Sequence, residues 1–292
     1  MTITWGELVD DAARRLASAF GEGRPHEARW IVERVSGYNA TELLLQGEEL
    51  VSARSVAYFD ALIARRVAGE PLQYVLGAWP FRSLELVVTP AVLIPRPETE
   101  HVAGFAIRAA TAAADRTGSG VVVVDLGTGS GAIGLSVAAE VVAAQVWCTD
   151  VSAEALAVAG ANLAGLGRIG TRVRLAQGSW FDALPPDLAG DIDVLVSNPP
   201  YVEADALLDD VVRNWEPHVA LFAPDEGFAF VGHIIDEAPR WLRPGGTLVL
   251  EMGETHSDCA QERAASVGLV DISTIVDLAG RNRGLVARRR NT

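Results

Sequence analysis

Between residues 125 and 134 the chain reads Asp-Leu-Gly-Thr-Gly-Ser-Gly-Ala-Ile-Gly. This run leaves a predicted buried strand over residues 121–125 and enters a predicted helix near residues 132–141. Glycine permits sharp turns and lets a ligand approach the backbone without meeting a Cβ atom. Asp150 ends the next predicted strand, 21 residues after Gly129, where a carboxylate can accept hydrogen bonds from ribose hydroxyls. Turn, strand and acid in this order predict a nucleotide-type site at the carboxyl ends of a sheet.

The chain around this turn alternates strand and helix. A predicted helix has Ser152 as its N-cap and Glu154 in its first turn. Alternation of this kind predicts right-handed βαβ units and a mostly parallel sheet covered on both faces. The turn around Gly280 is too short for a helical crossover, so the last strand is predicted to be antiparallel. Besides 121–125, the predicted strands are 145–150, 173–176, 194–197, 247–251, 270–276 and 284–288.

The first 70 residues have a different pattern, with apolar side chains at helical spacing. We expect three helices, of which the third covers residues 52–68 and is closed by Gly69 and Pro71. Residues 72–89 then change to a strand-like period, which predicts a β-hairpin. The predicted domains are a helical substrate-docking domain over 1–70, a hairpin linker over 71–92 and a catalytic domain over 93–292.

Composition excludes several classes of protein. The chain has 24 basic residues, all of them arginine, and 38 acidic ones, for a net charge of −14. Without lysine there is no P-loop and no Schiff-base enzyme, and the acidic balance argues against binding a nucleic-acid backbone. Two cysteines and five histidines show no metal-ligand spacing, so we expect no metal. The N-terminus resembles no signal peptide and no apolar run could span a membrane, which predicts a cytoplasmic protein.

The ligand of the glycine turn has two interpretations. Gly129, Gly131 and Gly134 satisfy the G-x-G-x-x-G fingerprint of dinucleotide-binding proteins, with Asp150 at a suitable distance. A nicotinamide-dependent dehydrogenase is therefore one alternative. The longer run from Gly127, preceded by Asp125, instead resembles the first motif of class I S-adenosyl-L-methionine (SAM) methyltransferases.

The stretch Asn198-Pro199-Pro200-Tyr201 follows the fourth predicted strand and favours methyl transfer. The lone pair of a planar NH₂ group is delocalised and is a poor nucleophile. The Asn198 side-chain oxygen and the Pro199 carbonyl can accept both N–H hydrogens and present the lone pair to a methyl donor. Consecutive prolines hold these acceptors rigidly, and Tyr201 offers a flat face to a planar group. A dehydrogenase has no use for this arrangement.

Together these motifs resemble the HemK/PrmC family, the release-factor glutamine methyltransferases. Other stretches carry the same resemblance along nearly the whole chain: Pro71–Gly77 with Pro80-Phe81, the block Ile94-Pro-Arg-Pro-Glu-Thr-Glu100, Gly178-Ser-Trp-Phe181, Glu216-Pro217, Ala220-Leu221 and Asp277–Arg283. The resemblance implies an N-terminal helical domain, a hairpin and a SAM-dependent, Rossmann-like catalytic domain. It also implies methyl transfer to the side-chain amide nitrogen (N5) of the glutamine in the Gly-Gly-Gln motif of peptide-chain release factors.

The resemblance also assigns residues. Gly127, Thr128, Gly129, Ser130 and Gly131 would hold the methionine end of SAM and of its product S-adenosyl-L-homocysteine. Asp150 would bind the ribose, Trp180 would lie beside the adenine, and Asn198 would touch both the cofactor and the target amide. Pro199, Pro200 and Tyr201 would complete the amide pocket.

Two alternatives stay open from the sequence: an adenine-N6 methyltransferase acting on DNA or RNA, and a SAM-binding protein without catalysis. Three further side chains also keep two interpretations each. Arg96 and Glu98 would line the cofactor mouth or order the hairpin, and Glu251, at the end of the fifth strand, would face the active site or serve a turn.

Overall fold

The structure is a computed structural model that describes residues 3–21, 24–277 and 279–291. Its contacts divide the chain into two compact units. The smaller unit holds the chain up to Ala78 and, from much later in the sequence, Asp209–Trp215. The larger unit holds Trp79–Leu208 and the chain from Glu216 onward. The first division therefore lies between Ala78 and Trp79, and nothing in the sequence pattern indicated that residues 209–215 join the smaller unit.

The smaller unit is helical, and its first helix shows why. A capping box between Thr4 and Glu7 begins α1, and Gly21 ends it in the left-handed conformation. One stripe of α1 packs into an apolar core with Ile31 of α2 and Phe59 of α4. The three predicted helices are present, joined by shorter ones that the sequence analysis missed. The helices of this unit are α1 (Trp5–Phe20), α2 (Pro25–Ser36), α3 (Ala40–Leu45), α4 (Ala53–Val67), α5 (Leu72–Leu76) and α9 (Asp210–Trp215).

The hairpin predicted over residues 72–89 is wrong in its first part. Leu72–Leu76 forms the short helix α5, whose Leu72 and Val75, three positions apart, are buried in the core of the smaller unit. Gly77 ends this helix at φ 72°. The hairpin itself is shorter, with β1 over Ala78–Phe81 and β2 over Leu84–Val87. Five residues, four of them apolar, do not distinguish a strand from one turn of a buried helix. Here the left-handed Gly77 is the helix-ending signal.

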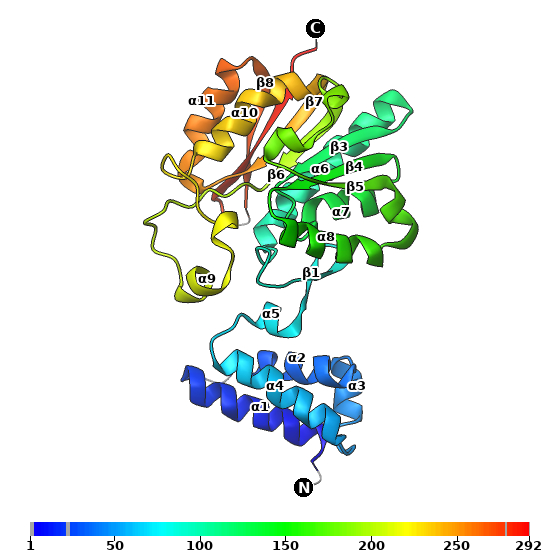
Figure 1. Cartoon of the computed structure of the whole chain (residues 1–292), viewed down its shortest axis with the longest axis vertical. Helices are drawn as coiled ribbons and strands as arrows, with labels where there is room; N and C mark the ends of the chain where they lie inside the picture. Colours follow the sequence, from blue (N-terminus) through cyan, green and yellow to red (C-terminus); the bar gives the residue numbers. More distant parts are fainter. Residues whose placement is uncertain (1–2, 22–23, 278, 292) are drawn as a thin grey trace. The chain divides into compact units, whose positions relative to one another are not determined.

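The larger unit is built on a seven-stranded sheet with the order β5-β4-β3-β6-β7-β9-β8 (Figure 1). Five neighbouring strands are parallel to one another, namely β5, β4, β3, β6 and β7. Strand β9 lies between β7 and β8 and is antiparallel to both. This confirms the mostly parallel, Rossmann-like sheet and the antiparallel last strand. The strands are β3 (Val121–Leu126), β4 (Ala144–Asp150), β5 (Val173–Gln177), β6 (Ile192–Ser197), β7 (Leu242–Glu251), β8 (Leu269–Val276) and β9 (Asn282–Arg289).

Helices cover both faces of this sheet (Figure 1). On one face α6 (Pro97–Thr117), α7 (Ala132–Glu140) and α8 (Ala153–Gly165) pack on one apolar cluster that includes Val123 and Val194. On the other face α10 (Ala229–Trp241) and α11 (Ser257–Ser266) pack on a second cluster with Leu126 and Leu195. Short 3-10 turns complete the unit at Gly167–Arg172, Trp180–Ala183, Pro186–Leu188, His218–Ala220 and Glu254–His256.

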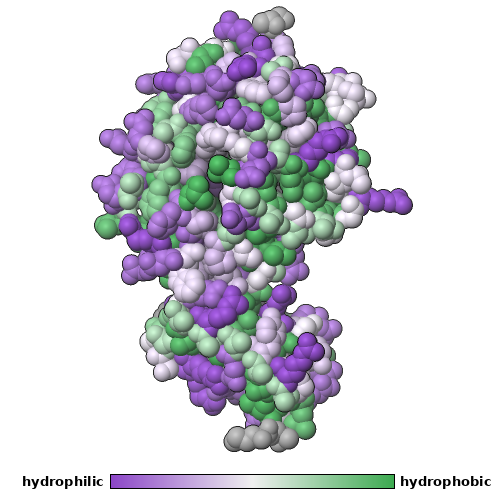
Figure 2. Space-filling model, in the orientation of Figure 1, coloured by the Kyte–Doolittle hydropathy of each residue, from purple (hydrophilic) through white to green (hydrophobic). Residues whose placement is uncertain are grey.

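Hydrophilic and hydrophobic side chains are mixed over the visible surface (Figure 2). Within the described ranges, no helix is both long and apolar enough to cross a membrane. In the same ranges, no cluster of three or more His, Cys, Asp or Glu side chains has the arrangement of a metal site.

At Gly134 the helix α7 packs directly against the sheet. A Cβ atom there would lie 2.4 Å from Cys148 Sγ on β4 and 3.0 Å from Asp125 Oδ2 on β3. We therefore expect Gly134→Ala to lower the free energy of unfolding of the larger unit by about 1–3 kcal/mol, the usual cost of overpacking a core. Denaturant unfolding measures this change.

The matched control is Cys148→Ala, alone and combined with Gly134→Ala. Because removing the sulfur makes room for the new methyl group, the double variant should lose less stability than the sum of the two single variants. An unchanged unfolding midpoint for Gly134→Ala would contradict the packing described here.

Candidate active site

A cavity opens at the carboxyl ends of the parallel strands, entirely within the larger unit. Its volume is about 270 Å³, near the lower end of small-molecule sites, which span about 300–1,000 Å³. Of the site residues predicted from the sequence, three do not line it, namely Gly131, Pro199 and Tyr201. The ones that do are Gly127, Thr128, Gly129, Ser130, Asp150, Trp180, Asn198 and Pro200.

The glycine turn forms the floor of the cavity. Gly129 has φ 56°, a conformation that favours glycine, and no neighbouring atom lies within 4 Å of a Cβ built there. The backbone at Gly129 therefore borders open space that a ligand can occupy. Gly131 serves the fold instead: it is the N-cap of α7 at φ 86°, and a Cβ there would meet Leu135 Cδ1 at 2.7 Å.

Asp150 stands at the end of β4 with its carboxylate held by two backbone amides. Oδ2 accepts a hydrogen bond from Gly129 N at 2.9 Å, and Oδ1 accepts one from Ser152 N at 2.9 Å. A carboxylate oxygen has two lone pairs, so each oxygen keeps one for a ligand. An acid held in this way beside an open glycine turn fits the paired hydroxyls of a ribose.

Asp125 is the buried acid beneath the turn. Its Oδ2 accepts hydrogen bonds from the Thr128 hydroxyl at 2.6 Å and from Gly134 N at 2.9 Å. Burial raises the pKa of Asp125 to about 7, against these two hydrogen bonds, which lower it. Asp125 is also among the residues that line the cavity. Asp125 thus ties the turn to the start of α7 and fixes the shape of the floor.

Two aromatic side chains form a wall of the cavity. The ring of Trp180 lies 5.2 Å, centroid to centroid, from that of Phe230 on α10. Trp180 also faces the glycine turn, 3.6 Å from a Cβ built at Gly127. A flat apolar wall suits a planar heterocycle. The sequence pattern singled out Trp180 but gave no signal for Phe230, which is brought to the site only by the packing of α10.

The Asn-Pro-Pro-Tyr loop leaves the end of β6 directly beside the glycine turn. Ser197, the last residue of β6, donates its hydroxyl to the Leu126 carbonyl at 2.6 Å and thereby anchors the loop to β3. Asn198 Nδ2 donates to Thr99 Oγ1 at 3.3 Å. The Tyr201 hydroxyl donates to Glu251 Oε1 at 3.2 Å, and burial raises the pKa of Tyr201.

The block Pro95–Glu100, at the start of α6, contributes a further wall. Arg96 lines the cavity and pairs with the Glu216 carboxylate, which also accepts a hydrogen bond from Ile94 N at 3.0 Å. Glu98 does not line the cavity and forms a longer ion pair, 3.6 Å, with Arg281. Of Arg96 and Glu98, Arg96 therefore belongs to the cavity wall and Glu98 does not.

Comparison with known proteins agrees with this geometry. The model of the PrmC N-terminal domain matches residues 7–77, and that of the methyltransferase small domain matches residues 111–216. The release factor glutamine methyltransferase of Bifidobacterium longum is 36% identical, with 96% of this chain and 98% of the relative covered. That of Moorella thermoacetica is 38% identical, with 99% of each chain covered.

A solved methyltransferase from Pyrococcus furiosus shares the fold, with a TM-score of 0.51 at 19% identity over 82% of this chain and all of that one. The glycine turn is thus that of a SAM-dependent methyltransferase and not that of a nicotinamide-dependent dehydrogenase. With the two family models in chain order and such identities over nearly its full length, the chain belongs to the family of release factor glutamine methyltransferases.

Proposed function

We propose that the protein transfers a methyl group from SAM to the side-chain amide nitrogen of the glutamine in the Gly-Gly-Gln motif of peptide-chain release factors. The observation that carries this proposal is the position of Asn198, an amide acceptor that lines the same cavity as the open glycine turn and Asp150. When bound, SAM supplies a methyl group on a positively charged sulfur. Release factors act in translation, so we also propose a cytoplasmic enzyme that does not contact nucleic acid.

Different residues of the site would bind the cofactor and position the target amide. Gly127, Thr128, Gly129 and Ser130 would hold the methionine end of the cofactor, with Gly131 shaping their turn. Asp150 would accept hydrogen bonds from the ribose, and Trp180 would contact the adenine. Asn198 would lie at the junction between the cofactor and the target amide.

The amide clamp would work by orientation. The Asn198 side-chain oxygen and the Pro199 carbonyl would accept the two N–H hydrogens of the glutamine amide and direct its lone pair at the methyl group. Pro200 and Tyr201 would hold this geometry, since consecutive prolines restrict the backbone and the Tyr201 hydroxyl is bonded to Glu251. Positioning of this kind accelerates the methyl transfer. No strong base is needed, because the nitrogen releases its proton readily once it carries the methyl group.

Labelled SAM with purified protein tests the proposal directly. Release factor and duplex DNA are offered in parallel, and peptide mass mapping locates the added methyl group. We expect one methyl on the Gly-Gly-Gln glutamine and none on DNA. Label confined to adenine would instead establish the nucleic-acid alternative, and binding of SAM without transfer to either would establish a non-catalytic protein.

Asp150→Ala tests the cofactor assignment. We expect SAM binding to weaken by about 1.5–3 kcal/mol, the scale of hydrogen bonds to a charged acceptor, as measured by calorimetry. Asp150→Asn is the matched control, because it keeps the size and one acceptor oxygen and should lose less affinity. An unchanged dissociation constant for SAM in Asp150→Ala would remove Asp150 from the cofactor site.

A further inference from the structure

One wall of the cavity carries a positive charge. Among the described residues that line the cavity, Arg96 is the only basic one, whereas the acids Asp125 and Asp150 line it elsewhere. The side chain of Arg96 is 33% exposed, and that of its ion-pair partner Glu216 is 1% exposed. Glu216 itself does not line the cavity. The cation is therefore the accessible member of the pair, and the acid is buried behind it.

Glu216 holds the arginine with both of its carboxylate oxygens in use. Oε1 accepts a hydrogen bond from Arg96 Nη2, and Oε2 accepts one from the backbone N–H of Ile94 at 3.0 Å. Arg96 is also the N-cap of α6, and Pro97 after it restricts its backbone. A guanidinium has five N–H donors in a rigid fork, and Glu216 accepts from one nitrogen of it. Arg96 is thus fixed in place by one side of its fork and can offer the other to a ligand.

The ion pair joins two stretches of the cavity wall that are far apart in the sequence. Residues 91–93 and Pro95 line the cavity just before Arg96, and Val219 and Ala220 line it shortly after Glu216. The ion pair therefore stands within the wall that a bound ligand meets, and not on a remote face of the larger unit.

The methionine end of SAM brings a carboxylate into this cavity. A carboxylate removed from water is costly unless hydrogen bonds or a cation stabilise it. Most amides of the glycine turn are already engaged within the protein. Thr128 N donates to the Thr149 carbonyl at 2.8 Å, and Gly131 N donates to the Thr128 carbonyl at 2.8 Å. Gly129 N donates to Asp150 at 2.9 Å. The turn thus offers the methionine end more room than charge.

We propose that Arg96 is the counter-ion of the α-carboxylate of SAM, and that Glu216 is the positioning residue that directs the guanidinium toward it. The planar fork of arginine matches the two oxygens of a carboxylate. This inference rests on the proposed placement of SAM in this cavity and does not depend on which amide receives the methyl group.

A counter-ion at this place also gives specificity for the amino-acid end of the cofactor. With the ribose on Asp150 and the carboxylate on Arg96, the sulfur between them would be held from both sides. Holding a reacting group from two sides orients it before the reaction. A molecule that lacks the carboxylate would keep the ribose contact and lose the contact with Arg96.

The test compares two ligands that differ by the carboxylate alone, SAM and decarboxylated SAM, by calorimetry on the full-length protein. We expect wild type to prefer SAM by about tenfold or more, the scale of a hydrogen bond to a charged group. Arg96→Gln should lose this preference because its affinity for SAM falls, whereas its affinity for decarboxylated SAM stays the same. Arg96→Lys keeps the charge without the fork and should retain part of the preference.

Glu216→Gln tests the positioning role. It keeps the size of the side chain and removes the charge that holds the guanidinium, so it should weaken SAM binding less than Arg96→Gln does. Combined with Arg96→Gln, it should add little further loss for SAM, since both changes act on one contact. Full additivity of the two losses would overturn the positioning role of Glu216.

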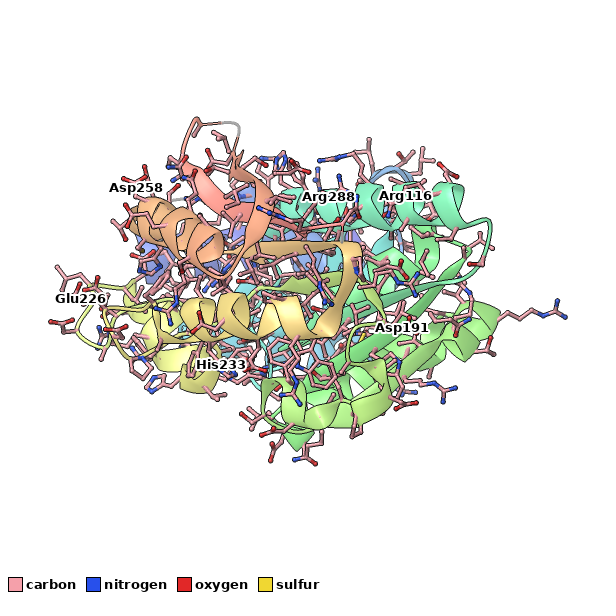
Figure 3. The ribbon with its side chains drawn as sticks, turned by 90° about the horizontal axis from the view of Figure 1, so that it is seen from above. Arg116, Asp191, Glu226, His233, Asp258 and Arg288 are labelled. Atoms are coloured by element: carbon pink, nitrogen blue, oxygen red, sulfur yellow. The ribbon has the colours of Figure 1, made fainter. Side chains whose placement is uncertain are left out.

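Arg288 on β9 is the matched control (Figure 3). It pairs with an acid, Asp271, its side chain is 36% exposed, and it does not line the cavity. Arg288→Gln should therefore leave the affinity for both ligands unchanged. Unchanged SAM affinity in Arg96→Gln, or an equal loss for both ligands in Arg96→Gln and Arg96→Lys, would overturn the role of Arg96. A wild-type protein that binds neither ligand would instead overturn the placement of SAM in the cavity.

Discussion

Replacing Asn198 by alanine is expected to lower the turnover of release-factor methylation by about a hundredfold or more, the scale seen when one preorganised polar group is lost. The variant removes the side-chain oxygen that would accept from the target NH₂ and leaves the glycine turn untouched. Single-turnover methyl transfer, followed with labelled SAM, measures the change. Affinity for SAM should change much less, because Asp150 and the turn at Gly127–Gly131 remain.

Asn198→Asp is the sharper comparison. Aspartate keeps the size and an acceptor oxygen, adds a charge and loses the NH₂ group that Thr99 accepts from. Residual activity above that of the alanine variant would support the acceptor role. Near-normal methylation of the Gly-Gly-Gln glutamine by Asn198→Ala would contradict the proposed amide clamp, even though the protein would still be a methyltransferase.

The sheet of the larger unit could be predicted because its central strands β3, β6 and β7 are mostly buried and apolar, and because glycine turns or helices separate the strands. Each predicted strand from residue 121 onward is present, with bounds that differ by a few residues. The position of β9 between β7 and β8 could not be seen in sequence order. The helix α5 was mistaken for a strand because a five-residue segment is too short to show a hydrophobic period. Local pattern thus identified the strands of this sheet and failed for the one-turn helix α5.

The motif residues of the site could be predicted from the sequence, but the contacts that orient them could not. The glycine turn, Asp150, Trp180 and Asn198 lie within recognisable motifs and meet at one cavity, because the carboxyl ends of neighbouring parallel strands lie along one edge. The contacts that orient these groups are long-range. Asn198 is hydrogen-bonded to Thr99, which lies 99 positions away in the sequence. Tyr201 is hydrogen-bonded to Glu251, which lies 50 positions away. Hydrogen bonds of this span depend on the folded chain, so the sequence alone left Glu251 with two interpretations and did not single out Thr99.

The smaller unit raises a separate question, namely whether it docks the substrate. Its core is its own, formed by α1, α2 and α4 with Leu72 and Val75 of α5, and the chain passes to the larger unit after Ala78. The cavity, by contrast, is lined only by residues of the larger unit. We therefore propose that the smaller unit binds the body of the release factor while the larger unit performs the chemistry.

Deleting residues 1–77 tests this division more cleanly than a deletion ending at residue 70, which would leave α5 without its core. We expect kcat/KM for the whole release factor to fall by about a hundredfold or more, the gain that a second linked binding contact commonly supplies. A short peptide containing Gly-Gly-Gln is the matched substrate. Because it lacks the body of the factor, the truncated and full-length proteins should methylate it at similar rates.

Affinity for SAM shows whether the larger unit stays folded after Asp209–Trp215 has lost its partners. A truncated protein that binds SAM and modifies the whole factor at the full-length rate would exclude docking by the smaller unit. Loss of the peptide activity together with SAM binding would show that the larger unit depends on the smaller one for its fold.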